Sequence, residues 1–166
     1  MLGVLLAAAA FSISSPAFTE GGNIPSKFTC DAGQTSPSPA LTWKDAPAGT
    51  KSFALVMDDP DVTQMPGGFV HWVLFDIPAT TTDLPEGFQV GSLGVSGNMG
   101  MRRPGYMGPC PPTGAHHYHF KLYALDVATL GLPQGATRAD IEKALAEHKP
   151  LAMAETIGIY QKQPKP

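Results

Sequence analysis

Alternation of side chains along the chain predicts three β-strands, at residues 51–59, 69–77 and 116–125. The second stretch is apolar on both faces, which is typical of a central strand. Pro60 and Pro78 end the first two stretches, because proline has no N–H to donate to a neighbouring strand. The alternation therefore predicts the centre of a β-sheet.

A helical pattern appears only near the C-terminus. Thr137 can cap a helix from residue 138 to about 148. The apolar face of that helix consists of Ile141, Ala144 and Leu145. Beyond Pro150, a second short helix is predicted from residue 151 to about 160. Its helical spacing is carried by Met153, Ile157 and Tyr160.

Composition supports one mainly β domain. The 166 residues are 43% hydrophobic, enough for a single core, and 18 glycines with 17 prolines favour strands joined by shaped loops. Charged residues make up only 15%, the net charge is −3, and lysine and arginine form no extended cluster. Nucleic acid is therefore excluded as a partner.

The N-terminal stretch has two interpretations. Residues 1–10 resemble a truncated secretory leader, but no lysine or arginine precedes Lys27, so a buried first strand is the alternative. A leader would place the mature domain, 11–166, in the periplasm or outside the cell; otherwise the protein is cytoplasmic. Cys30 and Cys110 fit one disulfide in an exported protein and two thiols in a cytoplasmic one.

The chemistry concentrates around a proline loop that leads into the third strand. Three prolines between Gly108 and Pro112 fix the shape of the loop before any ligand arrives. His116 and Tyr118 follow on one face of the strand, while His117 and His119 lie on the other. A preorganised loop beside histidine and tyrosine predicts a binding site.

Asp59 and His71 also stand at strand ends, on faces that are otherwise apolar. If the strands are neighbours, these groups meet His116, Tyr118 and the backbone of Gly108 in one small pocket for an anion. Asp59 would then either orient His71 by accepting its second N–H, or be protonated and donate to the ligand.

A purely structural interpretation competes with this one. Each histidine can be an ordinary hydrogen-bonded residue, and Asp59 can simply cap a turn. His117 and His119 are assigned to that interpretation, and no catalytic residue, metal ligand or cofactor is predicted. The stretch 94–98 does not match the nucleophile elbow of hydrolases, and neither a phosphate-binding P-loop nor a zinc-protease motif occurs.

Several segments resemble the phosphatidylethanolamine-binding proteins, also called Raf kinase inhibitor proteins, in their bacterial and archaeal branch. The resemblance covers nearly the whole chain, from 15–22 through 28–33, 38–43 and 46–50. Two motifs are the most specific. They are Asp59-Pro60-Asp61 followed by Gly68-Phe69-Val70-His71-Trp72, and the segment from Gly108 to Tyr118.

The resemblance implies a fold and a site. The fold is mainly β with α: a large antiparallel sheet packed with a smaller sheet, helices on the C-terminal side, and a first strand near 12–18. The site is a small pocket at the sheet edge that binds phosphate-like anions and phosphorylated headgroups. Its positions fall on Asp59, His71, Gly108, Pro111, His116 and Tyr118.

We therefore expect a non-enzymatic binding protein that holds a small anionic or phosphorylated ligand and acts through it on a partner protein, with a homodimer as a further expectation. Kinase inhibition carries over poorly, because we expect the longer C-terminal helix of eukaryotic members to be absent or shortened here. Arg102 and Arg103 are either ligand-attracting or ordinary surface charges. The alternatives are a hydrolase of phosphoesters or esters, and an interaction protein with a vestigial pocket.

Overall fold

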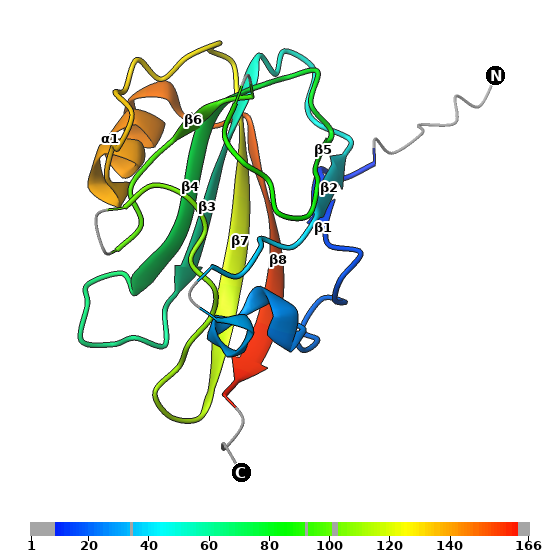
Figure 1. Ribbon diagram of the computed structural model, residues 1–166. Coiled ribbons are helices and arrows are strands. Elements are labelled where there is room, and N and C mark those ends of the chain that lie inside the picture. The colour runs from blue at the N-terminus through cyan, green and yellow to red at the C-terminus, as the bar shows by residue number, and fades with distance from the viewer. Residues whose placement is uncertain (1–8, 34, 92, 101–102, 163–166) are drawn as a thin grey trace, which may run out of the picture.

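Two antiparallel sheets form the body of the protein (Figure 1). The computed structural model describes residues 9–33, 35–91, 93–100 and 103–162. The smaller sheet has the order β1-β2-β5, with bounds Ser12–Ser14, Leu41–Lys44 and Asp83–Leu84. The larger has the order β6-β4-β3-β7-β8, with bounds Val95–Ser96, Phe69–Pro78, Ser52–Asp59, Ala115–Leu125 and Ala152–Gln161. The predicted pair of packed sheets is confirmed.

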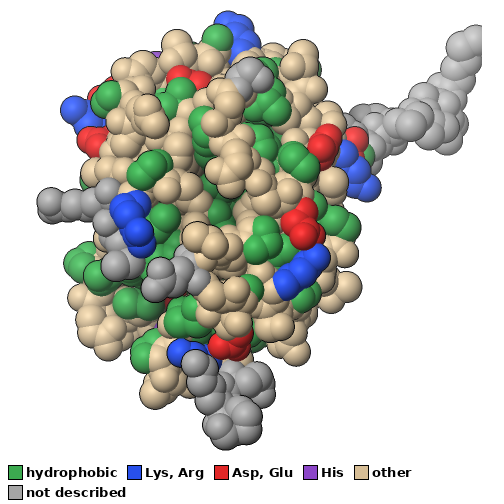
Figure 2. Space-filling model, viewed as in Figure 1, with side chains coloured by type: hydrophobic (Ala, Val, Ile, Leu, Met, Phe, Trp, Pro, Cys, Tyr) green, Lys and Arg blue, Asp and Glu red, His purple; other side chains and the backbone are tan. Residues whose placement is uncertain are grey.

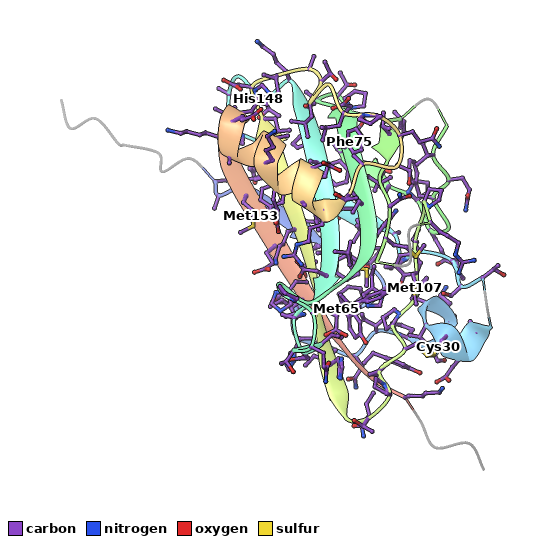
Figure 3. The ribbon with its side chains drawn as sticks, turned by 90° about the vertical axis from the view of Figure 1, so that its left-hand side faces the viewer. Cys30, Met65, Phe75, Met107, His148 and Met153 are labelled. Carbon is purple, nitrogen blue, oxygen red and sulfur yellow. A yellow bond between two sulfur atoms is a disulfide. The ribbon has the colours of Figure 1, made fainter. Side chains whose placement is uncertain are left out.

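Each face of the larger sheet covers a separate hydrophobic core. One core lies between the two sheets, and its largest buried side chains include Trp72, Tyr118, Phe28, Phe53 and Phe120. The other lies under α1 (Arg138–His148), the one α-helix among the described residues, and includes Val73, Phe75, Ile141 and Ala144. Figure 3 shows α1 in front of the strands and the segment around Cys30 and Met107 beside them at the lower right.

The helix has the predicted bounds and the predicted cap. Thr137 accepts a hydrogen bond from the backbone of Asp140, whose side chain bonds back to the backbone N–H of Thr137. Such a reciprocal capping box satisfies two N–H groups that a helix start leaves without partners. Ile141 and Ala144 are buried, as the helical pattern requires.

Charged side chains attach α1 to the sheet. Lys121 donates to both carboxylate oxygens of Asp58, which is 1% exposed, and Arg138 lies 3.4 Å from the same carboxylate. Arg138 also donates to the carbonyl of Gly67 in the loop after β3. A buried carboxylate needs such partners, so this cluster fixes the helix, the strand and the loop together.

The second predicted helix is wrong, because residues 152–161 form strand β8. The strand pairs with β7 along its whole length, from Ala152 opposite Ala124 to Gln161 opposite Ala115. Its buried positions alternate strictly, at Ala154, Thr156, Gly158 and Tyr160. Small and polar residues on the buried face concealed this period of two, and the apolar residues Met153, Ile157 and Tyr160 coincide with helical spacing. The β-branched Thr156, Ile157 and Ile159 were the better indication.

Strict alternation also fails within β4, which carries two β-bulges. Met57 pairs with Trp72 and Asp58 with Val70, so His71 is an extra residue with no counterpart on β3. A second irregularity falls at Phe75 and Asp76, and Asp76 has a positive φ of 55°. The bulges move Trp72 and Leu74 to the face between the sheets and Val73 and Phe75 to the helix side.

The first strand begins at Ser12 and is shorter than expected, although Phe18 beyond it is buried. Except for Ala9 and Ala10, both exposed, the predicted leader segment lies outside the described residues. Among the residues that the structure describes, no helix has the length and apolar character needed to cross a membrane.

Candidate functional site

Asp59, the last residue of β3, faces His116 near the start of β7. The Nδ1–H of His116 donates to Oδ2 of Asp59 over 2.7 Å, and the other carboxylate oxygen accepts the backbone N–H of Asp61. The Asp59 side chain is 3% exposed and that of His116 is 13% exposed. Asp59 therefore both caps the turn after β3 and orients the imidazole ring, so the Nε2 atom of His116 is its remaining polar end.

His71 is oriented by the backbone instead of by Asp59. The Nδ1–H of His71 donates to the carbonyl of Met107 over 2.8 Å, and the N–H of Met107 donates to the carbonyl of His71 over 2.9 Å. This exchange of two hydrogen bonds ties the bulge in β4 to the loop before β7. The prediction that Asp59 orients His71 is wrong, because the bulge lets His71 reach this loop while His116 occupies the carboxylate.

Tyr118 completes the cluster from the middle of β7. Its ring lies edge-on to the ring of His71, with 5.2 Å between centroids. The hydroxyl is buried beside the carboxylate of Asp59, but it makes no hydrogen bond of ordinary length and angle to the described residues. Burial, and next the negative charge of Asp59, raise the pKa of Tyr118, so the phenol stays protonated and can donate.

Burial lowers the pKa of His71 below its ordinary value, and the hydrogen bond to Met107 and the charge of Asp59 only partly oppose this. Neutral His71 carries its proton on Nδ1, since only a donor can bond to the carbonyl of Met107. Its Nε2 is then an acceptor. The cluster thus offers the O–H of Tyr118, the Nε2 of His116 and the accepting Nε2 of His71.

A disulfide holds the proline loop beside this cluster. Cys30 and Cys110 are bonded in the structure, with Cα atoms 5.4 Å apart, and the backbone N–H of Cys30 donates to the carbonyl of Pro109. The two cysteines lie on the 3₁₀-helix η2 (Cys30–Ala32) and in the loop before β7. A second short helix, η1 (Ser26–Phe28), precedes η2.

Gly108 is buried against the same segment. A Cβ at this position would lie 2.7 Å from the carbonyl oxygen of Phe28 and 2.9 Å from the Cα of Thr29. No larger residue fits there without displacing the loop. Pro111 is buried in the stretch between the disulfide and β7. Both residues therefore shape the loop by which Met107 reaches His71.

The histidines on the opposite face of β7 have partners of their own. His117 bonds to Asp61 over 2.8 Å, and His119 to Glu155 over 2.8 Å. The hydrogen bond from His117 lowers the pKa of Asp61. No group of three or more histidine, cysteine or acidic side chains suited to a metal occurs in the described part of the chain.

The structure brings four of the predicted site residues into one cluster, namely Asp59, His71, His116 and Tyr118. Two further contributors were missed. Phe69 lies edge-on to His71 with 4.9 Å between ring centroids, and its position two residues earlier in the strand could have indicated it. Met107 contributes only backbone atoms, which any residue type supplies, so no sequence signal marks it.

Comparison with known proteins decides the family. The sequence profile described as phosphatidylethanolamine-binding protein matches residues 14–161, which include both sheets except for the first two residues of β1. The chain belongs to the phosphatidylethanolamine-binding protein family. The cluster described above lies within the matched range.

Relatives in this family include bacterial proteins of similar length. A UPF0098 protein of Aquifex aeolicus is 44% identical over 160 residues, covering 93% of this chain and 90% of its own. The crystal structure of the phosphatidylethanolamine-binding protein homologue CT736 from Chlamydia trachomatis has a TM-score of 0.84 and 35% identity, covering 93% of this chain and 99% of that one. Escherichia coli YbcL, described as a member of the mammalian family, has a TM-score of 0.83 and 32% identity, covering 93% and 100%.

Proposed function

We propose that this protein binds a small anion, the phosphate or phosphorylated group of a ligand, without transforming it. The observation that carries the proposal is the buried hydroxyl of Tyr118, which lies beside Asp59 but makes no hydrogen bond of ordinary length and angle to the described residues. A buried donor without a partner costs stability, so its retention beside two oriented histidines favours a ligand that supplies the acceptor.

The polar atoms of the cluster match a protonated phosphate. Tyr118 donates, and a proton on Nε2 of His116 would let that ring donate to the anion while Asp59 accepts from Nδ1. The accepting Nε2 of neutral His71 suits a P–O–H group rather than a bare oxygen anion. A phosphate that keeps one proton satisfies all three groups.

Tyr118→Phe separates binding from folding. The variant loses a donor to a charged ligand, so its affinity for inorganic phosphate should fall by about tenfold or more. Its stability should stay equal or rise, because the change removes a buried hydroxyl that makes no hydrogen bond of ordinary length and angle to the described residues. Titration calorimetry gives the affinity and urea denaturation gives the free energy of unfolding. Unchanged phosphate affinity in the variant would contradict the proposal.

A hydrolase is the second candidate, because the Asp59–His116 pair has the arrangement of a general base with its orienting carboxylate. Titration with phosphoethanolamine, followed by phosphorus NMR of the same solution, distinguishes the two. The binding hypothesis is supported if the wild type gives a saturable heat of binding, His116→Ala abolishes this heat, and no free phosphate is formed. Release of phosphate by the wild type and not by the variant supports the hydrolase. If neither inorganic phosphate nor phosphoethanolamine gives a heat of binding, the interaction protein with a vestigial pocket is supported.

Export is part of the proposal. It is supported by the bonded Cys30–Cys110 pair, since disulfides persist in oxidising compartments. A relative from Mycobacterium tuberculosis, LppC, 43% identical over 157 residues, has the name of a lipoprotein. A regulated partner protein, of the Raf kinase inhibitor type or another, and a homodimer stay predictions.

A further inference from the structure

A hollow of about 990 Å³ lies between the larger sheet and the loops that cross it. Its lining comes from the segments around Cys30, Ser36, Phe88 and Tyr106, and from Trp72 on β4. None of the four side chains of the proposed anion site belongs to this lining. In Figure 2, hydrophobic and neutral side chains occupy the middle of the face and charged ones lie around it. The hollow has the size of pockets that hold organic molecules, and it is a space distinct from the anion site.

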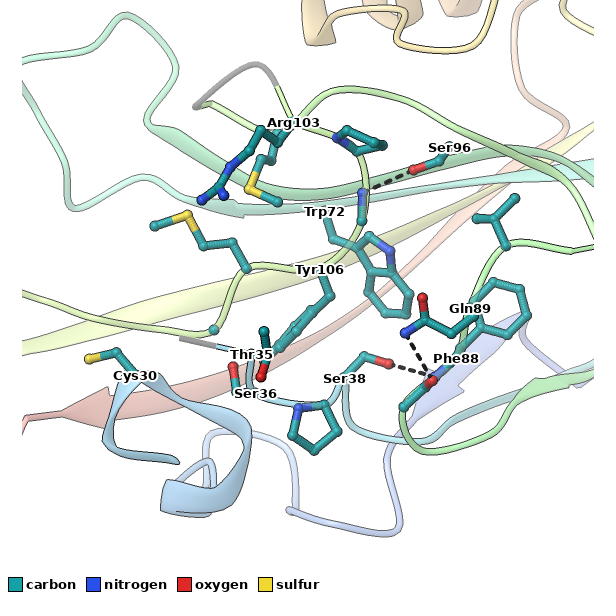
Figure 4. A pocket seen from close by; sticks show the side chains of 18 of the residues that line it. Cys30, Thr35, Ser36, Ser38, Trp72, Phe88, Gln89, Ser96, Arg103 and Tyr106 are labelled. Atoms are coloured by element: carbon teal, nitrogen blue, oxygen red, sulfur yellow. Dashed lines mark hydrogen bonds between the residues drawn. The ribbon is translucent and has the colours of Figure 1, made fainter. Parts of the chain in front are cut away.

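Three aromatic side chains form a row across the hollow (Figure 4). The ring of Trp72 lies edge-on to that of Tyr106, with 5.4 Å between centroids, and its centroid is 6.5 Å from that of Phe88. Trp72 is only 1% exposed, so it lies at the inner end of the space. Rings at such spacings favour a flat aromatic guest, which can pack edge-on or offset against them.

Hydrogen bonds hold this row in place. The hydroxyl of Tyr106 donates to the carbonyl of Phe28 over 2.8 Å. The backbone N–H groups of Gly87 and Phe88 donate to the carbonyl and the hydroxyl of Ser38, over 2.9 and 3.2 Å. Because the lining is ordered by its own contacts, a guest does not have to order it on binding.

The charge of the lining is positive. Arg103 is the one charged side chain among the described residues that line the hollow, and it forms no ion pair with a described carboxylate. Figure 4 shows Arg103 on one side of the hollow and Ser36 on the other. A guanidinium group donates two parallel hydrogen bonds to a planar carboxylate. A guest with one carboxylate therefore matches this lining. The neighbouring Arg102, predicted together with Arg103, lies outside the described residues.

Neutral polar side chains limit how long an apolar guest can be. Thr35, Ser36, Gln89 and Gln134 interrupt the apolar lining. A long acyl chain would cover such groups without giving them hydrogen bonds, which costs free energy. A compact ring system needs only the aromatic row, so the lining favours a ring over a chain.

From this geometry we infer that the hollow is a second ligand site, for a small aromatic carboxylic acid. Its rings lie against Trp72, Tyr106 and Phe88, and its carboxylate is directed to Arg103. The inference goes beyond the proposed function, because the two sites share no side chain and can be occupied at the same time. A long-chain fatty acid is the competing occupant.

The test compares three probes by calorimetry: 2-naphthoate, its neutral amide 2-naphthamide, and undecanoate, which has the same number of carbon atoms as the naphthoate. Naphthoate should bind most tightly. Its advantage over naphthamide should be about two- to fivefold, because Arg103 is exposed and the ion pair is partly screened by water. Absence of a heat of binding with naphthoate, an affinity for naphthamide that equals or exceeds that for naphthoate, or tighter binding of undecanoate overturns the inference.

Variants of the lining assign the binding to the hollow. Arg103→Gln should lower the affinity for naphthoate to that for naphthamide. Phe88→Ala should weaken naphthoate by about tenfold, because the ring loses apolar contact. Val90→Trp, at a lining position that is 39% exposed, should fill the space with little risk to folding and also weaken naphthoate. Met153→Trp is the matched control, at a position 49% exposed and outside the lining. Naphthoate affinity that stays at the wild-type value in Phe88→Ala and Val90→Trp overturns the inference.

Inorganic phosphate separates this inference from the proposed function, if ionic strength is held constant. Naphthoate should bind equally well with and without saturating phosphate. Displacement of naphthoate by phosphate, or loss of naphthoate binding in His116→Ala, would place the acid in the anion site and overturn the inference. If phosphate does not bind and naphthoate does, with the predicted dependence on Arg103 and Phe88, the proposed function fails and the second site stands. If phosphate binds and naphthoate does not, only the second site fails.

Discussion

His71 is a buried histidine held neutral by its surroundings, and it makes stability depend on pH. Burial lowers its pKa in the folded protein below the ordinary 6.5, so below pH 6.5 the unfolded chain takes up a proton that the folded protein refuses. The free energy of unfolding therefore decreases as pH falls from 6.5 toward the folded pKa. Urea denaturation between pH 7.5 and 5 measures this.

His71→Asn is the control for that prediction, since its amide can still donate to the carbonyl of Met107. As pH falls, the free energy of unfolding of the variant should decrease less than that of the wild type, while the contributions of the other histidines persist. An identical pH profile in wild type and variant would show that His71 does not carry the effect.

The same residue predicts how binding depends on pH. Because Nε2 of neutral His71 accepts, it prefers a phosphate that keeps a proton, and phosphomonoesters lose that proton with a pKa of about 6. Methyl phosphate should thus bind more tightly at pH 5.5 than at pH 8, by several-fold. Calorimetry at the two pH values checks this. Tighter binding at pH 8 would mean that the site selects the dianion.

At the scale of elements, the Cys30–Cys110 bond connects segments that are 80 residues apart in sequence. Replacing both cysteines by alanine frees the unfolded chain and should lower the free energy of unfolding by about 2–4 kcal/mol. Because the bond holds the loop of Gly108, phosphate affinity should fall too. Denaturation and calorimetry on one preparation measure both.

Reduction of the wild type with a dithiol is the matched condition, because it opens the bond without changing the sequence. It should reproduce the lower stability and the weaker binding of the double variant. If reduction leaves phosphate affinity intact, the remaining contacts, such as Tyr106 to Phe28, are enough to position the loop.

Most elements could be predicted because their periodicity is local. The alternation around Met57 and Phe120 and the cap at Thr137 are each contained within one segment. Local alternation does not reveal strand β8, because its buried face carries Gly158 and Thr156. Whether these two residues suit a buried face depends on the side chains that pack against them. Gly158, for instance, lies where a Cβ would come 2.5 Å from Ile24.

The residues of the candidate site could be predicted from the sequence, but the hydrogen bonds among them could not. Strand ends indicated Asp59 and His116, because neighbouring strands bring their ends together. The bulge at His71 depends on the pairing of β4 with β3, which no single segment encodes. The choice of His116 rather than His71 as the partner of Asp59 follows from that bulge.

In the whole molecule, the cluster of Asp59, His71, His116 and Tyr118 and the helix α1 lie on opposite faces of the larger sheet. A ligand that binds only the folded protein stabilises all of it, so phosphate at 100 times its dissociation constant should add about 2.7 kcal/mol. For a chain of this size that corresponds to a rise in melting temperature of roughly 5–10 °C. Thermal denaturation with and without phosphate measures the rise, and chloride at equal ionic strength is the control.

The same comparison applied to Tyr118→Phe tests whether the stabilisation comes from the cluster. The rise should shrink in the variant at equal phosphate concentration, while α1 and both cores stay intact. A full rise in Tyr118→Phe would place the bound phosphate elsewhere on the molecule.

The extra position of His71 in β4 makes the site separable from the scaffold. Without His71, Val70 opposite Asp58 and Trp72 opposite Met57 would become consecutive pairs, so the ladder would be continuous from Phe69 to Leu74 and these side chains would keep their present faces. The other irregularity of β4, at Phe75 and Asp76, does not depend on this residue. His71 is therefore an addition to the ladder, and a chain shortened by it should retain the sheet while losing the acceptor of the proposed site.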